Sequence, residues 1–364
     1  MITKTSKRFL VAPLDWGLGH TTRIIPFIRY LHTLKHTVVF AGNEAQRQFI
    51  SQTFPNIDTL HLDGYAVHYS KSRWAFMPSM LAQVPRLLGV LRKEHQWLLQ
   101  QCATQHFDAI ISDNRYGLYH PTIPSVILTH QLQILTGLGF LADNELQRIH
   151  YGLLKKFNSC WVVDVPASPN LSGKLAHPSH PLPTAKYLGL LSQLQPTNVP
   201  TYTGDHLLIL LSGPEPQRTI LASLLWQQAL EHKGKVVFVE GSTSAIPPAY
   251  IPPHIQYHSQ LTASALQPIL SQAAMVICRS GYSTLMDLVA MHKKAILIPT
   301  PGQTEQEYLA KHLHAQGVFY SHPQKGFDLS TALFSAAQFP YKSLHLSDAH
   351  NIYKYVIDAW LKNI

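Results

Sequence analysis

The feature that most constrains how this chain can fold is the alternation of apolar runs and polar turns across residues 275–310. Met275–Cys278 and Ala295–Ile298 are short, uninterrupted apolar runs. Strands buried on both faces of a parallel sheet have this pattern, because neither face needs polar side chains. The segment therefore predicts two parallel strands, each followed by a turn and a helix.

The turn after the first of these strands carries residues that suit an anionic ligand. Arg279, Ser280 and Gly281 follow the strand directly. Ser283 and Thr284 then offer N-cap oxygens to the next helix. Hydroxyls, backbone N–H groups and an arginine at the carboxyl end of a parallel strand are typical of a nucleotide or anion site. The sequence therefore predicts such a site at this turn.

The rest of the chain repeats the order of strand, glycine turn and helix, and it divides into two halves. Its 364 residues exceed the length of one ordinary domain. A strand is predicted at Phe9–Leu14, and the pattern restarts at His206–Leu211. Because this order forms right-handed βαβ units, we predict an α/β fold with two Rossmann-like domains that face each other across a cleft. The expected boundaries are a first domain at 1–185, a Pro- and Ser-rich linker at 186–204, a second domain at 205–345, and a C-terminal helix at 346–364 that can pack back on the first domain.

The first turn of the chain contains a candidate catalytic base. Gly17 and Gly19 permit a tight turn and the close approach of a ligand, and His20 follows at the start of a helix. The helix dipole there lowers the pKa of an imidazole and favours its neutral form, which can accept a proton. The alternative is a histidine held by local hydrogen bonds. Thr22 stands where the GxGxxG pattern needs its third glycine, which argues against an NAD-dependent oxidoreductase.

Two further predicted strands end in polar residues. The strand Asp108–Asp113 ends in a carboxylate, and Ser125–Thr129 is followed by His130 and Gln131. Polar residues at the carboxyl ends of strands line the crevice of an open α/β sheet. Asp113, His130 and Gln131 are therefore candidate site residues. The alternative for each is a helix cap or a loop hydrogen bond.

The charge of the chain narrows the choice of partner. Only 13% of the residues are charged, and Lys+Arg exceed Asp+Glu by 29 to 20, which gives a formal net charge of +9 with the histidines neutral. A basic chain favours an anionic partner such as nucleotide phosphates or an acidic membrane surface. The absence of a run of lysine and arginine argues against nucleic acid. Residues 72–100 mix apolar and basic side chains, and they form either a core helix pair or a surface for lipid or acceptor.

The cysteines and the hydropathy indicate the compartment. The three cysteines are scattered, with neither a CxxC pair nor metal-ligand spacing, which is typical of a reduced cytosolic protein. No apolar run reaches the roughly 18 residues of a membrane-spanning helix. We therefore expect a cytoplasmic protein with peripheral contact at the inner face of the plasma membrane. We expect no metal and no other cofactor.

The carboxyl-terminal motif closely resembles the donor site of family 28 glycosyltransferases, the MurG-like transferases with the GT-B fold. The residues that carry the resemblance are Ile277–Gly281, Thr284, Asp287, Pro299 and Gln306. Two shorter motifs agree with it. Gly17–His20 is similar to the amino-terminal glycine loop of that family, which ends in a histidine, and Thr129–Gln131 resembles part of its His-Glu-Gln-Asn crevice motif.

The resemblance implies a transferase that uses UDP-N-acetylglucosamine or another UDP-hexose as co-substrate. It implies that Asp287 binds the ribose hydroxyls and that Gln306 contacts the donor sugar. Ser212 and the backbone at Gly281–Thr284 would hold the diphosphate. The implied donor-side residues are Gly17, Gly19, Ser212, Arg279, Ser280, Gly281, Ser283, Thr284, Asp287 and Gln306.

The implied reaction is a metal-independent, inverting transfer of a hexose or N-acetylhexosamine to an acceptor hydroxyl. The acceptor would be lipid-linked or a cell-envelope glycan. His20 would be the base, with Asp113, His130 and Gln131 as acceptor-side residues or a second base.

The chain departs from the family pattern at several residues of the predicted site, and the family's linker arginine has no clear counterpart near Gly189–Gln193. Asp287 stands where the family has a glutamate, and His130 stands in place of the crevice glutamate, which makes it a rival to His20 as the base. Pro214 interrupts the loop where the family has Gly-Gly-Ser-x-Gly, and proline removes an N–H donor.

Two other functions stay open. One is a UDP-sugar 2-epimerase, which needs acidic catalytic residues in the cleft, and the other is a non-catalytic nucleotide-sugar-binding protein.

Overall fold

The computed structural model of the protein describes residues 6–15, 18–65, 84–136, 139–195, 204–242, 245–344, 346 and 348–364. The prediction on Gly17 and the first part of the 72–100 prediction, residues 72–83, lie outside these residues. The described residues form two compact units. The first unit contains the residues up to Leu191 and those from Leu346 onward, and the second unit begins at Ser192. The prediction of an α/β fold with two parallel-sheet domains is confirmed.

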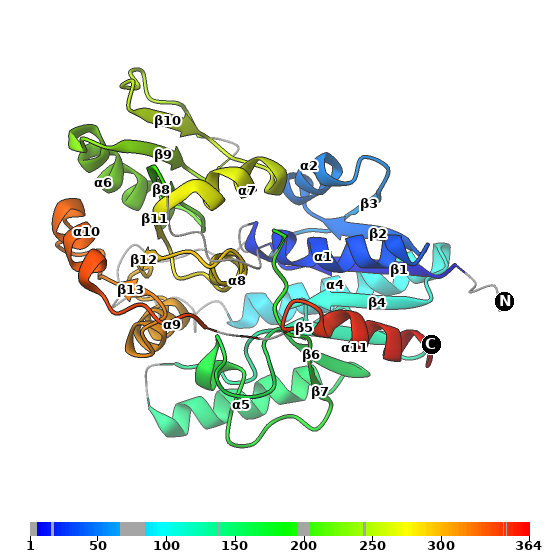
Figure 1. Cartoon of the computed structure of the whole chain (residues 1–364). Coiled ribbons are helices and arrows are strands. Elements are labelled where there is room, and N and C mark those ends of the chain that lie inside the picture. Colours follow the sequence, from blue (N-terminus) through cyan, green and yellow to red (C-terminus); the bar gives the residue numbers. More distant parts are fainter. Residues whose placement is uncertain are drawn as a thin grey trace. The chain divides into compact units, whose positions relative to one another are not determined.

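The first unit is built on a parallel sheet in the order β3-β2-β1-β4-β5-β6-β7 (Figure 1). Its strands are β1 (Arg8–Pro13), β2 (Thr37–Gly42), β3 (Asp58–His61), β4 (Ala109–Asp113), β5 (Ser125–Thr129), β6 (Ser159–Val162) and β7 (Ala185–Tyr187). Its helices are α1 (Gly19–Thr33), α2 (Glu44–Thr53), α4 (Val84–Thr104), α5 (Phe140–Leu154) and α11 (Ile352–Leu361), with a 3-10 turn at Gly173–Leu175.

Alternating side chains of this sheet pack on two different sets of helices. On one face, Trp161 of β6 lies against Phe27 of α1 and Trp360 of α11, with ring centroids 5.6 and 5.0 Å apart. On the other face, Leu10 of β1 packs in one cluster with Leu98 of α4. The chain's last helix therefore belongs to the first unit because its tryptophan completes that unit's core.

The second unit has a parallel sheet in the order β10-β9-β8-β11-β12-β13 (Figure 1). Its strands are β8 (His206–Leu210), β9 (Lys235–Val239), β10 (Ile255–His258), β11 (Ala273–Cys278), β12 (Ala295–Leu297) and β13 (Tyr320–Ser321). Its helices are α6 (Gln217–Glu231), α7 (Ala263–Gln272), α8 (Tyr282–Ala290), α9 (Thr304–Ala315) and α10 (Leu329–Gln338). One core cluster joins Ile209, Phe238 and Ile277 of the strands to Leu225 of α6.

Each sheet contains one point where the strand order reverses. In the first unit the chain builds outward from β1 through β2 to β3, and it then returns to place β4 on the other side of β1. In the second unit the chain builds outward from β8 through β9 to β10, and it then returns to place β11 on the other side of β8. Loops diverge at such a switch point, and ligands of open α/β sheets bind there, outside the carboxyl ends of the strands. The β1/β4 and β8/β11 pairs therefore locate the candidate sites.

Two expectations on local structure are wrong. Helix α8 begins at Tyr282 with Gly281 as its N-cap residue, so Ser283 and Thr284 lie inside the helix and do not cap it. Residues 186–191 belong to the first unit and not to a linker. The reason is that β7 pairs with β6 and that Leu188, Leu190 and Leu191 are buried, so these residues are part of a core although the surrounding sequence is rich in turn formers.

Candidate functional site

The switch point of the first sheet brings together His20 and Asp113. Asp113 is the last residue of β4. Its backbone carbonyl accepts a hydrogen bond from the N–H of Leu14, the residue that follows β1. His20 lies in the first turn of α1, the helix that follows β1. Its Nδ1 lies 3.1 Å from Oδ2 of Asp113. Two residues that are 93 positions apart in the sequence therefore form one histidine–carboxylate pair.

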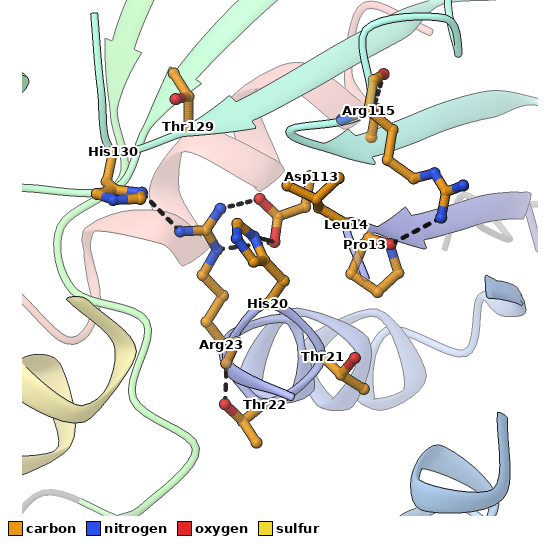
Figure 2. A network of polar contacts seen from close by, with 12 residues as sticks. Pro13, Leu14, His20, Thr21, Thr22, Arg23, Asp113, Arg115, Thr129 and His130 are labelled. Atoms are coloured by element: carbon orange, nitrogen blue, oxygen red, sulfur yellow. Dashed lines mark hydrogen bonds and ion pairs between the residues drawn. The ribbon is translucent and has the colours of Figure 1, made fainter. Parts of the chain in front are cut away.

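A buried arginine connects this pair to His130, as Figure 2 shows. Arg23 lies one helical turn after His20, on the same side of α1. Its Nε donates to Oδ2 of Asp113 at 2.8 Å, and its Nη2 donates to Oδ1 of the same carboxylate. Its Nη1 lies 2.9 Å from Nδ1 of His130, just beyond β5. The side chains of Arg23 and Asp113 are almost completely buried.

The charges of this cluster keep His20 neutral. Burial alone would raise the pKa of Asp113, but the Arg23 guanidinium and the His20 contact outweigh it and lower that pKa to about 2. Burial lowers the pKa of His20, and the positive charge of Arg23 lowers it further, against the opposite effect of Asp113. Near neutral pH the cluster thus holds a carboxylate, a guanidinium and an uncharged imidazole. The side chain of His20 is 15% exposed, so a ligand can reach it.

The other predicted residues of the first unit, Gln131 and Gly19, have local roles next to this cluster. Gln131 donates its backbone N–H to the Thr129 hydroxyl at 3.1 Å, so it closes a local turn at the end of β5. Gly19 is the first residue of α1. The sequence reasoning missed Arg23. The sequence signal for it is an arginine within the apolar stripe of α1. Such an arginine is buried, and a buried guanidinium needs a buried carboxylate as its partner.

The switch point of the second sheet carries two glycines whose surroundings are open. Gly281 precedes α8 and Gly213 follows β8. A Cβ added at either position would meet no atom within 4 Å. Gly281 has an ordinary φ of −74°, so neither packing nor backbone strain explains a glycine there. Because glycine has no side chain to cap a helix, the positive end of the α8 dipole faces this open space.

Two of the predicted donor-side residues, Arg279 and Ser280, hold the neighbouring loops together. Arg279 is buried and donates to the carbonyls of Ile298 and Pro299 at 3.2 Å and to that of Gln217 at 2.8 Å. Burial lowers the pKa of its guanidinium to about 10. The Ser280 hydroxyl donates to the Gln306 carbonyl at 2.8 Å. These side chains tie the ends of β11 and β12 to the starts of α6 and α9, and so they shape the loops around the open space.

The remaining predicted side chains are distributed over the same edge. Oε1 of Gln306 accepts a hydrogen bond from the Thr300 N–H at 3.0 Å, which fixes the turn after β12. Ser212 is half-buried in the loop after β8, and Ser283 and Thr284 are half-buried in the first turn of α8. Within the described residues, no group of three or more His, Cys, Asp or Glu side chains is arranged to hold a metal ion.

Asp287 is held by the segment at which the second unit begins. Its Oδ1 accepts from the Ser192 hydroxyl at 2.6 Å and its Oδ2 accepts from the Gln193 amide at 3.0 Å. Burial raises its pKa to about 6, although both hydrogen bonds oppose the shift. A nucleotide ribose would therefore have to displace Ser192 and Gln193 in order to reach this carboxylate.

Replacing Asp287 with asparagine is expected to flatten the dependence of stability on pH. The folded pKa lies above the unfolded value of 3.8, so this group stabilises the fold below about pH 4, and that contribution is lost as the pH rises through about 6. The difference amounts to about 3 kcal/mol, because one pKa unit corresponds to about 1.4 kcal/mol. Urea unfolding at pH 4 and pH 7 measures it.

The matched variant for this test is Ser192→Ala. It removes a hydrogen bond that favours the ionised carboxylate, so it is expected to extend the loss of stability to higher pH. Equal pH dependence in the wild type and Asp287→Asn would contradict the assignment.

The fold defines the class of the protein. Solved structures of similar architecture include the glycotransferase of kitacinnamycin, with a TM-score of 0.66 and 13% identity over 99% of each chain. SnogD from Streptomyces nogalater has a TM-score of 0.58 and 13% identity over 98% of this chain and 100% of that one. MurG from Acinetobacter baumannii has a TM-score of 0.54 and 14% identity over 99% and 100%. The protein has the GT-B fold of these glycosyltransferases.

A family model identifies the group within that class. Residues 236–340 match the model described as the glycosyltransferase family 28 C-terminal domain. Residues 236–340, which lie in the second unit, therefore match the C-terminal domain of that family, and the predicted resemblance is confirmed. A search of the curated proteins finds no match to the sequence.

Proposed function

We propose that this protein is a metal-independent, inverting glycosyltransferase that moves a hexose or N-acetylhexosamine from a UDP-sugar to an acceptor hydroxyl. The observation that carries the proposal is the His20–Asp113 pair at the β1/β4 switch point, held by Arg23. A neutral histidine whose Nδ1 bonds a carboxylate has its other nitrogen available as a base. Such a base is what the attack of a hydroxyl on an anomeric carbon requires.

The reaction follows from this arrangement in one displacement. Nε2 of His20 takes the proton of the acceptor hydroxyl while that oxygen forms a bond to the anomeric carbon. The bond from the anomeric carbon to the UDP oxygen breaks on the opposite side, so the configuration inverts. UDP leaves with the bonding electrons, and the imidazolium formed at His20 is stabilised by Asp113.

The open end of α8 suits the leaving diphosphate. The charge that develops on UDP is negative, and helix N-termini stabilise negative charge. Gly281 lets the phosphate oxygens approach the backbone closely, since a Cβ there would occupy the space that they need. Arg279 stabilises this loop through its hydrogen bonds to three backbone carbonyls.

A thermal-shift screen with UDP, GDP, TDP and ADP sugars tests the donor. UDP-sugars are expected to stabilise the protein most, by about 2.7 kcal/mol at a ligand concentration of 100 times Kd. Gly281→Val is the matched variant, because its backbone angle is ordinary and its side chain would fill only the open space. It should fold and lose the shift. A larger shift with another nucleotide, or a full shift in Gly281→Val, would contradict the donor assignment.

Exposed side chains of α5 support a lipid-linked acceptor and contact with an anionic membrane. Phe140 and Leu141 at the start of the helix and Ile149 further along are 73%, 81% and 64% exposed. Arg148 lies in the same helix, where it pairs with Glu145, and the exposed Lys155 and Lys156 follow its last residue. Apolar side chains beside cations suit the interface of an anionic bilayer. None of the helices in the described residues has the length and apolarity that crossing a bilayer demands, so the proposed contact, at the inner face of the plasma membrane, is peripheral.

The double variant Phe140→Ser, Leu141→Ser is expected to weaken binding to anionic vesicles at least about tenfold, because two large apolar side chains no longer enter the interface. Vesicle sedimentation at low and high salt measures the binding, which should also weaken as salt screens the cations. Phe334→Ser, which changes a 67% exposed phenylalanine on α10, is the control. Equal binding of both variants, or no binding by the wild type, would contradict membrane contact.

Incubation with UDP-N-acetylglucosamine alone separates the proposal from its two alternatives. Slow release of UDP is expected of a transferase. Interconversion of the sugar would indicate a 2-epimerase, and tight binding with no turnover on any acceptor would indicate a binding protein. The state of Asp113 argues against the epimerase, because a carboxylate with a pKa of about 2 that is engaged by Arg23 is a poor proton carrier near neutral pH.

A further inference from the structure

Arg23 lies between the two histidines that compete for the role of the base. In Figure 2 its guanidinium lies beside the ring of His20, with two nitrogens directed at Asp113 and the third at His130. Asp113 receives two hydrogen bonds from it, and Nδ1 of His130 lies 2.9 Å from Nη1. The two histidines thus meet different partners through the same ring atom. Nδ1 of His20 faces a carboxylate, and Nδ1 of His130 faces a guanidinium.

These partners determine where each ring carries its proton. A guanidinium has five N–H donors and no acceptor, so the nitrogen that it bonds has to accept. Nδ1 of His130 therefore carries no hydrogen, and the single proton of the ring is on Nε2. An ionised carboxylate only accepts, so Nδ1 of His20 carries its hydrogen and donates it to Asp113. The lone pair of His20 is then on Nε2.

The guanidinium cannot easily turn away from this arrangement. Its Nε and Nη2 are engaged by the two oxygens of Asp113. The Asn114 amide, in the orientation that satisfies both of its ends, accepts from the same Nη2 at 3.2 Å. Arg23 and His130 are both buried, so water does not compete for the contact between them. The proton on Nε2 of His130 is therefore set by the fold.

We infer that Arg23 is a positioning residue that gives the two histidines opposite roles, with His20 as the proton acceptor and His130 as a hydrogen-bond donor through Nε2–H. Whatever contacts Nε2 of His130, whether protein or substrate, has to accept a hydrogen bond. Where the family has a glutamate, whose ionised carboxylate can only accept hydrogen bonds, this chain presents a donor. A substrate group at this position therefore has to offer a lone-pair oxygen, such as a carbonyl, carboxylate or phosphate oxygen. The catalytic part of this inference rests on the proposed function, but the proton positions do not.

Nitrogen-15 NMR of the full chain, labelled at histidine, tests the proton positions without any substrate. Long-range proton–nitrogen correlations at pH 7.5 distinguish a protonated ring nitrogen from an unprotonated one. The signals of His20 and His130 are assigned among the 22 histidines by their loss in His20→Gln and His130→Gln. The expected result is an unprotonated Nδ1 in His130 and a protonated Nδ1 in His20. A proton on Nδ1 of His130, whether or not Nε2 is also protonated, would overturn the inference even if the protein is a transferase.

Kinetics of the same variants test the roles. His130→Gln is expected to raise KM for the acceptor more than it lowers kcat, and to keep the acid limb of the kcat–pH profile, because glutamine still offers an N–H and the base is elsewhere. His20→Gln should remove that acid limb together with most of the turnover. If His130→Gln removes the acid limb instead, His130 is the base and the assignment is reversed. A correct NMR result without any transferase activity would refute the proposed function alone.

Discussion

Replacing His20 with glutamine is expected to lower turnover by about 10²–10⁴-fold, which is the usual contribution of a general base. Glutamine keeps a polar side chain of similar reach but cannot take a proton. Donor binding should persist, because the loops proposed to hold the diphosphate, around Ser212 and Gly281, lie in the second unit. UDP release with a full donor–acceptor pair measures the effect. In the wild type, kcat/KM should fall in acid as His20 becomes protonated, and since burial lowers the pKa of His20, the midpoint of that fall should lie below pH 6.5.

A second histidine–carboxylate pair in the same unit provides the control for this experiment. Nε2 of His61 lies 2.9 Å from Asp63, but the side chain of His61 is 59% exposed and far from the β1/β4 switch point in the sheet order. His61→Gln should therefore leave turnover unchanged. Turnover of His20→Gln within a few-fold of the wild type would show that the base is another group.

Replacing Arg23 with methionine is expected to cost about 3–5 kcal/mol of unfolding free energy, because it leaves the Asp113 carboxylate buried without its partner. Replacing both residues, with Arg23→Met and Asp113→Leu, should cost much less than the sum of the two single changes, since no charge is then left unpaired. Urea unfolding of the two single variants and the double variant gives the coupling free energy of the pair.

The control for the buried pair is an exposed one. Arg148 and Glu145 of α5 lie 2.8 Å apart and are largely exposed to solvent. Arg148→Met is expected to change the unfolding free energy very little, because water already solvates both charges. Additive losses in the Arg23 and Asp113 variants would mean that the two side chains do not stabilise one another, and the site would lose its organising contact.

Much of the fold could be predicted from the sequence because buried parallel strands are continuous apolar runs. The runs at Met275–Cys278 and Ala295–Ile298 correspond to β11 and β12, and the run near the amino terminus corresponds to β1. The short edge strand β7 could not be placed in this way. It is three residues long and half-exposed, so its pairing depends on a neighbouring strand and not on its own pattern.

The site was partly predictable for a similar reason. His20 and Asp113 could be named because polar residues at the carboxyl ends of strands have no role in a sheet core. Arg279 and Asp287 were assigned to the donor from their order in the sequence. In the structure Arg279 donates to three loop carbonyls, and Asp287 accepts hydrogen bonds from Ser192 and Gln193. Sequence order cannot tell a side chain that faces a ligand from one that braces the loop beneath it.

By itself, then, the sequence determined the α/β class, the two-part organisation and the residues at the strand ends, because these follow from local periodicity and from turn chemistry. Only the tertiary structure decided which polar groups meet. Arg23 bonds Asp113 and His130 across 90 and 107 residues of chain, and those contacts exist because β1, β4 and β5 are neighbours in the sheet. The proton positions on the two histidines follow from those contacts, since a ring nitrogen donates or accepts according to the partner that the fold brings to it.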